Sequence, residues 1–155
     1  MEDDPQRPGQ QMKMLLDSSV VSKLFIEEED SNDVSEIIRL GIDDGVTFIA
    51  SELMHYEVGN VILKREKQIS NARELITRVF DLSIQCHVMD QHSSSEAMKL
   101  AKENNITFYD AVHVQAAMEH NATMVTADEE LLQKFKITVR VEDALKQLKK
   151  NVQRK

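Results

Sequence analysis

Four acidic residues, Asp17, Glu57, Asp110 and Asp128, are the side chains of this 155-residue sequence best suited to chemistry. Asp17 closes an apolar run that is typical of a buried strand, and Asp128 follows a second such run. In open α/β sheets, ligands bind beyond the carboxyl ends of the strands, where the strand order reverses. If the two strands are neighbours at that point, which the sequence does not prove, both carboxylates line one crevice.

Each aspartate also has a purely structural interpretation. Asp17 could be a solvated strand end, and Asp128 could cap the helix that follows it. Asp110 occupies the third position after Thr107, where a carboxylate serves as a capping-box partner. Taken one at a time, the aspartates therefore leave both interpretations open.

Glu57 decides between them, because it falls in the middle of an expected helix, too far from either end to act as a cap. Asn60 follows one turn later, and Leu53 shares the same side of the helix. A carboxylate against an apolar wall is costly unless it is paired or bound to a cation. Glu57 therefore favours a functional acidic cluster.

Carboxylates without cysteine ligands suit a hard divalent ion, Mg²⁺ or Mn²⁺. Without such an ion the carboxylates repel one another, so we expect at least one raised pKa among them. The five histidines show no zinc-binding spacing, and Cys86, the single cysteine, is expected in a buried strand. No glycine-rich phosphate-binding motif is present in the sequence.

The elements that would position these acids alternate between strands and helices. We expect strands near 14–17, 46–50, 85–89, 122–126 and 137–141, with helices near 31–43, 51–67, 70–82, from 93, 107–120, after 128 and from 141 to the end. Ser51 is expected to cap the second helix, and Ser93 to open the fourth in a capping box with Glu96. This alternation predicts an α/β fold, a mostly parallel sheet with helices on both faces.

Composition is that of a single domain, with 41% hydrophobic and 30% charged residues and a net charge of −8. We interpret residues 1–11 as a loose tail or cloning remnant, and 12–155 as one domain that ends in a basic helix. The sequence contains no apolar run long enough to span a membrane and no secretory signal pattern. A cytoplasmic protein without membrane attachment is therefore expected.

The segments around the four acids resemble the PIN-domain family, and most closely the VapC-type toxin ribonucleases. The resemblance rests on Asp17 in LLDSSVV, Glu57 in YEVGNVI, Asp110 in TFYDAVHVQAA and Asp128 in VTADEELL. It covers roughly residues 12–141, with the motifs in family order. Each motif alone is weak, but the four together, each on the right type of element, are specific.

The resemblance implies a Rossmann-like parallel sheet of order 3-2-1-4-5 with an acidic pocket at its carboxyl edge. It implies an endoribonuclease that depends on Mg²⁺ or Mn²⁺, with the four acids as catalytic and metal-binding residues. Supporting polar residues by motif are Ser18, Ser19, Asn60 and Thr126. Proteins of this type commonly form homodimers, and a cognate antitoxin inserts a segment into the pocket and keeps them inactive.

Residue chemistry leads to a consistent mechanism, in which a metal ion activates a water for in-line attack on phosphorus. The 2′-hydroxyl is not needed, so the expected products carry 5′-phosphate and 3′-hydroxyl ends. His113, one turn after Asp110, could contact a phosphate or shuttle a proton. The commoner role of such a histidine is to pack on the flank of its helix.

Several alternatives remain open. A receiver-type signalling domain needs an additional acid pair near the first strand, whereas Asp17 is followed by Ser18 and Ser19. A ribosomal-RNA-processing or RNA-decay nuclease of the PIN type, and a PIN module that binds without cutting, are the other candidates.

The acidic net charge argues against bulk electrostatic attraction of RNA. However, residues 140–155 hold six basic against two acidic residues. This end, together with Lys64, Arg65 and Lys67, is expected to supply local phosphate contacts.

Overall fold

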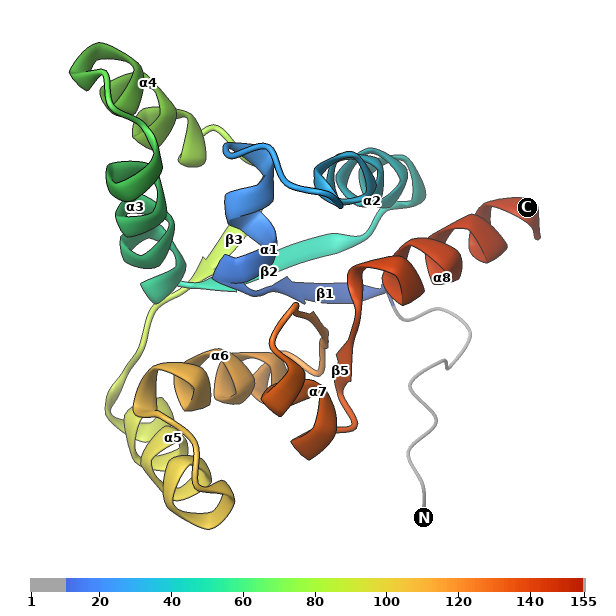
Figure 1. The fold of residues 1–155 in the computed structure, drawn as a ribbon. Coiled ribbons are helices and arrows are strands. Elements are labelled where there is room, and N and C mark those ends of the chain that lie inside the picture. The colour runs from blue at the N-terminus through green and yellow to red at the C-terminus, as the bar shows by residue number, and fades with distance from the viewer. Residues whose placement is uncertain (1–10, 155) are drawn as a thin grey trace.

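The sheet is formed by five parallel strands in the order β3-β2-β1-β4-β5 (Figure 1). The structure is a computed structural model that describes residues 11–154, so nearly all of the expected tail, residues 1–11, lies outside the described residues. The strands are β1 Lys13–Leu16, β2 Thr47–Ser51, β3 Ile84–His87, β4 Thr123–Val125 and β5 Thr138–Val139. The predicted strand order is confirmed.

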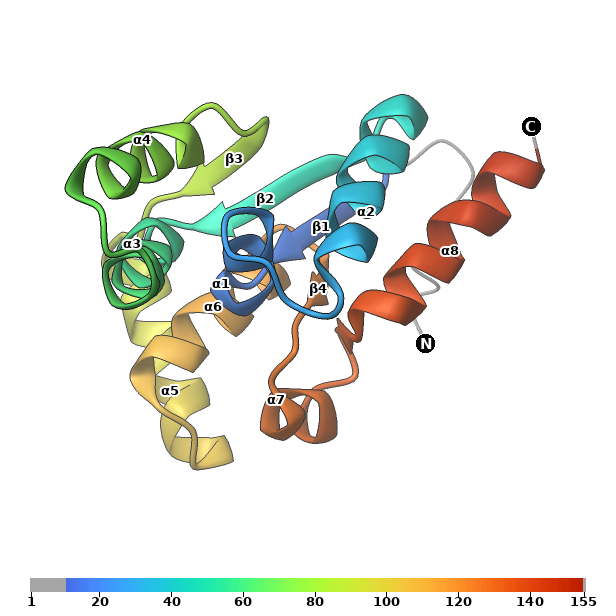
Figure 2. The ribbon, with the colours of Figure 1, turned by 45° about the horizontal axis from the view of Figure 1, so that its top comes forward.

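Helices cover both faces of the sheet, as predicted (Figure 2). One face carries α1 Ser18–Val21, a short 3-10 turn Ser22–Leu24, α2 Ser31–Asp44, α3 Leu53–Arg65, α4 Ile69–Val79 and α8 Val141–Gln153. The other face carries α5 Gln91–Asn104, α6 Phe108–Glu119 and α7 Glu129–Lys134. None of these described helices is long and apolar enough to cross a membrane.

A hydrophobic core lies on each face of the sheet, because successive side chains along a strand point to opposite faces. Met14 and Leu16 of β1 pack among the helices of the α2 face, whereas Leu15 between them packs under α6. All three side chains are fully buried, as expected for a parallel sheet covered on both sides. The α6 helix is buried at every position from Ala111 to Ala117, so it forms the centre of its layer.

The α2 helix lies very close to β2 because Gly41 has no side chain. A Cβ atom at Gly41 would lie 2.3 Å from Cζ of Phe48, whose ring is buried in the core. The helix ends at Gly45, which adopts a left-handed conformation with φ of 76°. Gly41 therefore sets the spacing between the helix and the sheet, and Gly45 ends the helix.

Three local predictions were wrong. Ser51 does not cap α3 but is the last residue of β2, and Glu52 precedes the helix. The capping box of α5 is formed by Asp90 with Ser93, because the helix begins two residues before Ser93. Cys86 is exposed, since β3 is an edge strand.

Candidate active site

Asp17 lies just after β1 and is only 6% exposed, and hydrogen bonds from three residues hold its carboxylate. Oδ1 accepts a hydrogen bond from the backbone N–H of Ser18 at 2.8 Å, and so caps α1. Oδ2 accepts from Oγ of Ser19 at 3.0 Å and from Oγ1 of Thr126 at 2.7 Å. Since Thr126 directly follows β4, the predicted adjacency of the first and fourth strands is what brings these groups together.

Asp128 is tied to the same site through Thr126. The backbone N–H of Asp128 donates to Oγ1 of Thr126 at 3.0 Å, and its own carboxylate caps α7 by accepting from the N–H of Leu131 at 3.1 Å. The N–H of Ala127 donates to Oγ of Ser19 at 3.2 Å. The structural interpretation of Asp128 as a cap is therefore correct, and the residue still lies in the loop that joins the site.

Asp110 sits in the first turn of α6 and accepts a hydrogen bond from Oγ1 of Thr107 at 2.6 Å. Burial raises the pKa of its carboxyl, and the charges of Asp128 and Asp17 raise it further. The Thr107 hydrogen bond and His113 act in the opposite direction without cancelling the shift. The predicted raised pKa in the cluster is confirmed, and it shows that these three aspartates act on one another.

His113 is the centre of the site, contrary to the expectation that it packs on the flank of its helix. The ring is 1% exposed, with Nδ1 at 3.0 Å from Oγ of Ser51 and Nε2 at 2.5 Å from Oε1 of Glu57. The Nε2 atom also lies 3.7 Å from Oδ1 of Asp17. Two acids from different elements, β1 and α3, therefore meet across one imidazole.

Opposing effects act on the pKa of His113. Burial lowers it, but the hydrogen bond to Glu57 and the negative charges of Asp17, Glu57 and Asp110 together raise it above the usual value. A protonated ring donates from both nitrogens, to Ser51 and to Glu57. The surrounding carboxylates thus favour the protonated form of the ring.

One signal in the sequence points to His113 before its partners are known. The α6 helix is apolar on all sides, and a polar side chain in such a helix must find a partner. The partner Ser51 carries no such signal, because a serine ahead of a helical segment is also typical of a cap. Its role becomes visible only when β2 and α6 are placed together.

Glu57 lies in the middle of α3, partly exposed, with one oxygen held by His113. Asn60, one turn later, is exposed and makes no hydrogen bond to the acids within residues 11–154. It instead lines a groove between α3 and α4. The structure therefore brings four acids, His113, Ser18, Ser19 and Thr126 into one network, and leaves Asn60 outside it.

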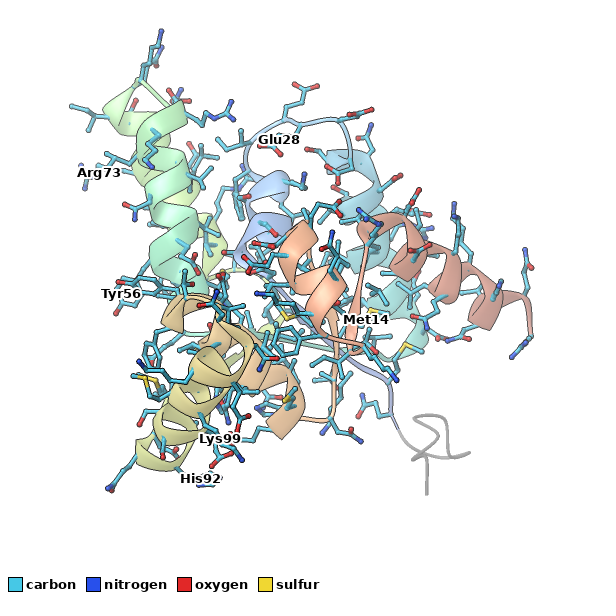
Figure 3. The ribbon with its side chains drawn as sticks, turned by 60° about the horizontal axis from the view of Figure 1, so that its bottom comes forward. Met14, Glu28, Tyr56, Arg73, His92 and Lys99 are labelled. Atoms are coloured by element: carbon cyan, nitrogen blue, oxygen red, sulfur yellow. The ribbon has the colours of Figure 1, made fainter. Side chains whose placement is uncertain are left out.

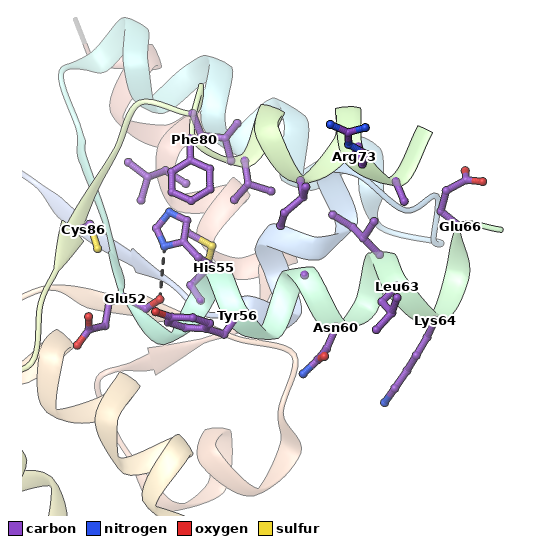
Figure 4. Close-up of a pocket in the computed structure, with 18 of the residues that line it drawn as sticks. Glu52, His55, Tyr56, Asn60, Leu63, Lys64, Glu66, Arg73, Phe80 and Cys86 are labelled. Atoms are coloured by element: carbon purple, nitrogen blue, oxygen red, sulfur yellow. Dashed lines mark hydrogen bonds between the residues drawn. The ribbon is translucent and has the colours of Figure 1, made fainter. Parts of the chain in front are cut away.

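The groove between α3 and α4 has a volume of about 1250 Å³, and none of the four acids lines it (Figure 4). Its walls include Ile62, Leu63, Ile76 and Phe80, and the ring of Phe80 stacks on His55 with centroids 4.6 Å apart. Its chemistry is that of an apolar binding surface rather than of a catalytic centre.

The donor set fits a hard cation. Within the described part of the chain, no three His, Cys, Asp or Glu side chains are arranged as a complete metal site. Mg²⁺ is commonly held by one or two carboxylates, with water and substrate oxygens completing its shell. Burial, followed by the charges of Asp128 and Asp17, disfavours the ionised form of Asp110, and a divalent ion would favour it. Asp17 and Asp110 are the residues that fit this role.

Comparison with known proteins gives a consistent result. The family model described as PIN domain matches residues 14–136. The chain is 28% identical over 135 residues to the ribonuclease VapC3 of Pyrobaculum aerophilum, which covers 80% of this chain and 95% of that protein.

Solved structures resemble the fold. A crystal structure from Pyrobaculum aerophilum has a TM-score of 0.66 at 26% identity, with 88% of this chain and 95% of the other covered. A toxin–antitoxin complex from Klebsiella pneumoniae has a TM-score of 0.63 at 15% identity, with 83% and 97% covered, which is a likeness of fold.

Proposed function

Because the chain belongs to the PIN-domain family, we propose that it is an endoribonuclease that depends on Mg²⁺ or Mn²⁺ and hydrolyses RNA phosphodiesters. The observation that carries the proposal is the geometry of the acids: Thr126 donates to Asp17 and accepts from the N–H of Asp128, and Nε2 of His113 lies 2.5 Å from Glu57 and 3.7 Å from Asp17. Several interacting carboxylates at the carboxyl edge of a parallel sheet form the kind of site that binds a hard cation and a phosphate.

In this proposal Asp17 and Asp110 would hold the cation, with Glu57 and Asp128 as the further acids of the site. A bound divalent ion neutralises charge on the phosphate and lowers the pKa of water. The other roles belong to side chains of the protein. Ser18, Ser19 and Thr126 fix the Asp17 carboxylate by hydrogen bonds.

His113 holds Glu57 in one orientation through the contact between Nε2 and Oε1. The free oxygen of Glu57 then accepts the hydrogen bond of the attacking water. Attack by water on the side opposite the 3′-oxygen leaves 5′-phosphate and 3′-hydroxyl ends.

We further infer that the protein is the toxin of a toxin–antitoxin pair, with a homodimer and a cognate antitoxin as its protein partners. The likeness to ribonuclease VapC3 and the fold of the Klebsiella pneumoniae complex support this inference. The apolar groove between α3 and α4 is suited to protein contact, because exposed side chains such as Leu63 and Phe80 gain from being covered. An RNA-processing or RNA-decay nuclease is the second candidate within the family.

The decisive experiment is a cleavage assay on mixed RNA with Mn²⁺ or Mg²⁺, with EDTA as the control. We expect metal-dependent cutting, ends that a 5′-phosphate-specific exonuclease digests, and no cutting by Asp110→Asn. A chain that binds Mn²⁺ but cuts no RNA would instead be a non-catalytic PIN module. Growth arrest on expression, relieved by Asp17→Asn, would separate a toxin from a processing enzyme.

A further inference from the structure

Two grooves adjoin the residues that hold Asp17, and they carry opposite charge. The first, about 290 Å³ and here called the basic groove, is lined by Ser19, Ser22, Lys23, Glu28, Val61, Lys64, Arg65 and Ala127. The second, about 640 Å³ and here called the acidic groove, is lined by Lys23, Glu28, Glu29, Asp30, Asp33, Thr126, Ala127, Arg140, Val141 and Glu142. The basic groove has three cations to one carboxylate, whereas the acidic groove has five carboxylates to two cations.

The basic groove begins at the residues that hold Asp17. Ser19 lines it, and the same hydroxyl donates to Oδ2 of Asp17 and accepts from the N–H of Ala127. The opposite wall is the end of α3, where Lys64 and Arg65 follow Glu57 by about two turns, or roughly 11 Å along the helix. One helix therefore carries both an acid of the site and the cations of the groove.

Glu28 now occupies the mouth of this groove. It lies on the loop that joins α1 to α2 (Figure 3), with Oε2 at 3.0 Å from Nζ of Lys23 and Oε1 at 3.8 Å from Nη2 of Arg65. A carboxylate thus stands in front of two cations, in the position that an incoming phosphate oxygen would take.

The two cations differ in how firmly they are held. Lys23 is 11% exposed and also binds Asp30 at 2.6 Å, so its charge is already neutralised inside the fold. Arg65 is 63% exposed, and its contact with Glu28 is long. Lys64, also exposed, forms no ion pair within the described residues. Lys64 and Arg65 are therefore the cations of the groove that can accept another anion.

We propose that Lys64 and Arg65 bind a phosphate of the RNA strand next to the scissile one, and that this phosphate replaces Glu28 in front of Arg65. The basic groove is then the path of the strand away from the acidic site. This inference rests on the proposed endoribonuclease function and adds the direction in which the substrate lies. The acidic groove repels a second strand segment, because its Arg140 is already paired with Glu129.

The test measures binding of an end-labelled, single-stranded RNA of mixed sequence by fluorescence anisotropy, in EDTA so that the RNA stays intact. We expect Lys64→Ala and Arg65→Ala each to weaken binding about threefold to tenfold and to reduce the slope of log K against log salt by about 0.7. Lys67→Ala is the matched control, since Lys67 lies on the same stretch of chain but does not line the basic groove. It is expected to bind like the unchanged protein.

Glu28→Gln tests the replacement step. Removing the charge that competes with phosphate is expected to strengthen binding about threefold, while Glu27→Gln, the same change one residue away, leaves it unaltered. The proposal is overturned if Lys64→Ala and Arg65→Ala bind like the unchanged protein, or if Arg140→Ala weakens binding instead. It is also overturned if the unchanged protein binds no better than the Lys64 and Arg65 double variant.

A parallel cleavage assay with Mn²⁺ separates this inference from the proposed function. If the unchanged protein cuts RNA and the two variants keep its KM, the groove assignment fails and the nuclease assignment stands. If the protein cuts no RNA while the variants bind as expected, hydrolysis is excluded and the groove assignment stands for a module that only binds RNA.

Discussion

Ser51 Oγ and His113 Nδ1 are hydrogen-bonded at 3.0 Å in a fully buried position where the end of β2 meets α6. This contact fixes one side of the imidazole and leaves its other nitrogen directed at Glu57. A hydroxyl that performs no chemistry therefore determines where a carboxylate of the proposed active site stands.

Ser51→Ala is expected to destabilise the protein by about 1–3 kcal/mol, because it leaves Nδ1 of His113 buried without a partner. Urea unfolding measures the change. Ser35→Ala, an exposed serine of α2, is the control and is expected to change stability by less than about 0.5 kcal/mol. Equal stabilities for the two variants would contradict the importance of the buried contact.

Stability of the metal-free protein is expected to fall as pH rises above 6.5, because the folded-state pKa of His113 is raised. The charged ring contributes in full below its unfolded pKa, and this contribution is lost as pH rises through the folded pKa. One proton gives a slope of at most about 1.4 kcal/mol per pH unit. Unfolding curves in EDTA across this range should show a steeper fall for the native chain than for His113→Gln; parallel curves would contradict the assignment.

Asp110→Asn is expected to abolish cleavage and at the same time raise the melting temperature of the metal-free protein by about 1–3 °C. A raised folded-state pKa means that the ionised form is disfavoured, a cost that is absent below pH 3.8 and present in full above the folded pKa. Asparagine removes this cost and keeps the acceptor for Thr107.

Asp17→Asn gives the contrasting case. Both oxygens of Asp17 accept hydrogen bonds, so an amide nitrogen would face a hydroxyl donor, and this variant should lose both activity and stability. Calorimetry measures the melting temperatures of Asp17→Asn and Asp110→Asn. Changes of the same sign in the two variants would contradict these hydrogen-bond patterns.

The sequence predicted the strands and placed Asp17 and Asp128 at strand ends, because apolar runs, caps and strand ends are patterns along one segment. The order of the strands, which brings the two aspartates together, was implied by the resemblance to the PIN-domain family. Ser51, Glu57 and His113 form a contact set that no local pattern contains, since the partners of His113 lie 62 and 56 residues away. Their pairing depends on the register between β2, α3 and α6. The misplaced caps at Ser51 and Ser93 have the same origin, because serine suits several positions at a helix start and packing selects one.

Mn²⁺ is expected to raise the melting temperature of the unchanged protein reversibly, with EDTA restoring the original value. Binding to the folded state alone contributes about 2.7 kcal/mol at a hundredfold excess over the dissociation constant. The shift should be greatly reduced in Asp17→Asn. A shift of the same size in that variant would place the ion elsewhere.

Gly41→Ala is expected to destabilise the protein by about 1–3 kcal/mol, because its Cβ would lie 2.3 Å from the buried ring of Phe48. Gly59→Ala, in α3, is the matched control. Its Cβ would meet Ile76 at 3.4 Å, and the better helix propensity of alanine stabilises by about 0.5–1 kcal/mol. Denaturant unfolding of both should give changes of opposite sign; two losses of similar size would argue against the close approach of α2 to β2.

Asp17 caps α1 and Asp128 caps α7, whereas Glu57 caps no helix. The ionised form of Asp110 destabilises the metal-free fold. Selection for folding alone therefore protects Asp17 and Asp128 as caps and Glu57 as the partner of the buried His113, but not Asp110. In a lineage that abandons RNA cleavage, Asp110 is expected to change first, while the other three acids persist. Loss of activity in descendants of this sequence should accordingly be diagnosed at Asp110.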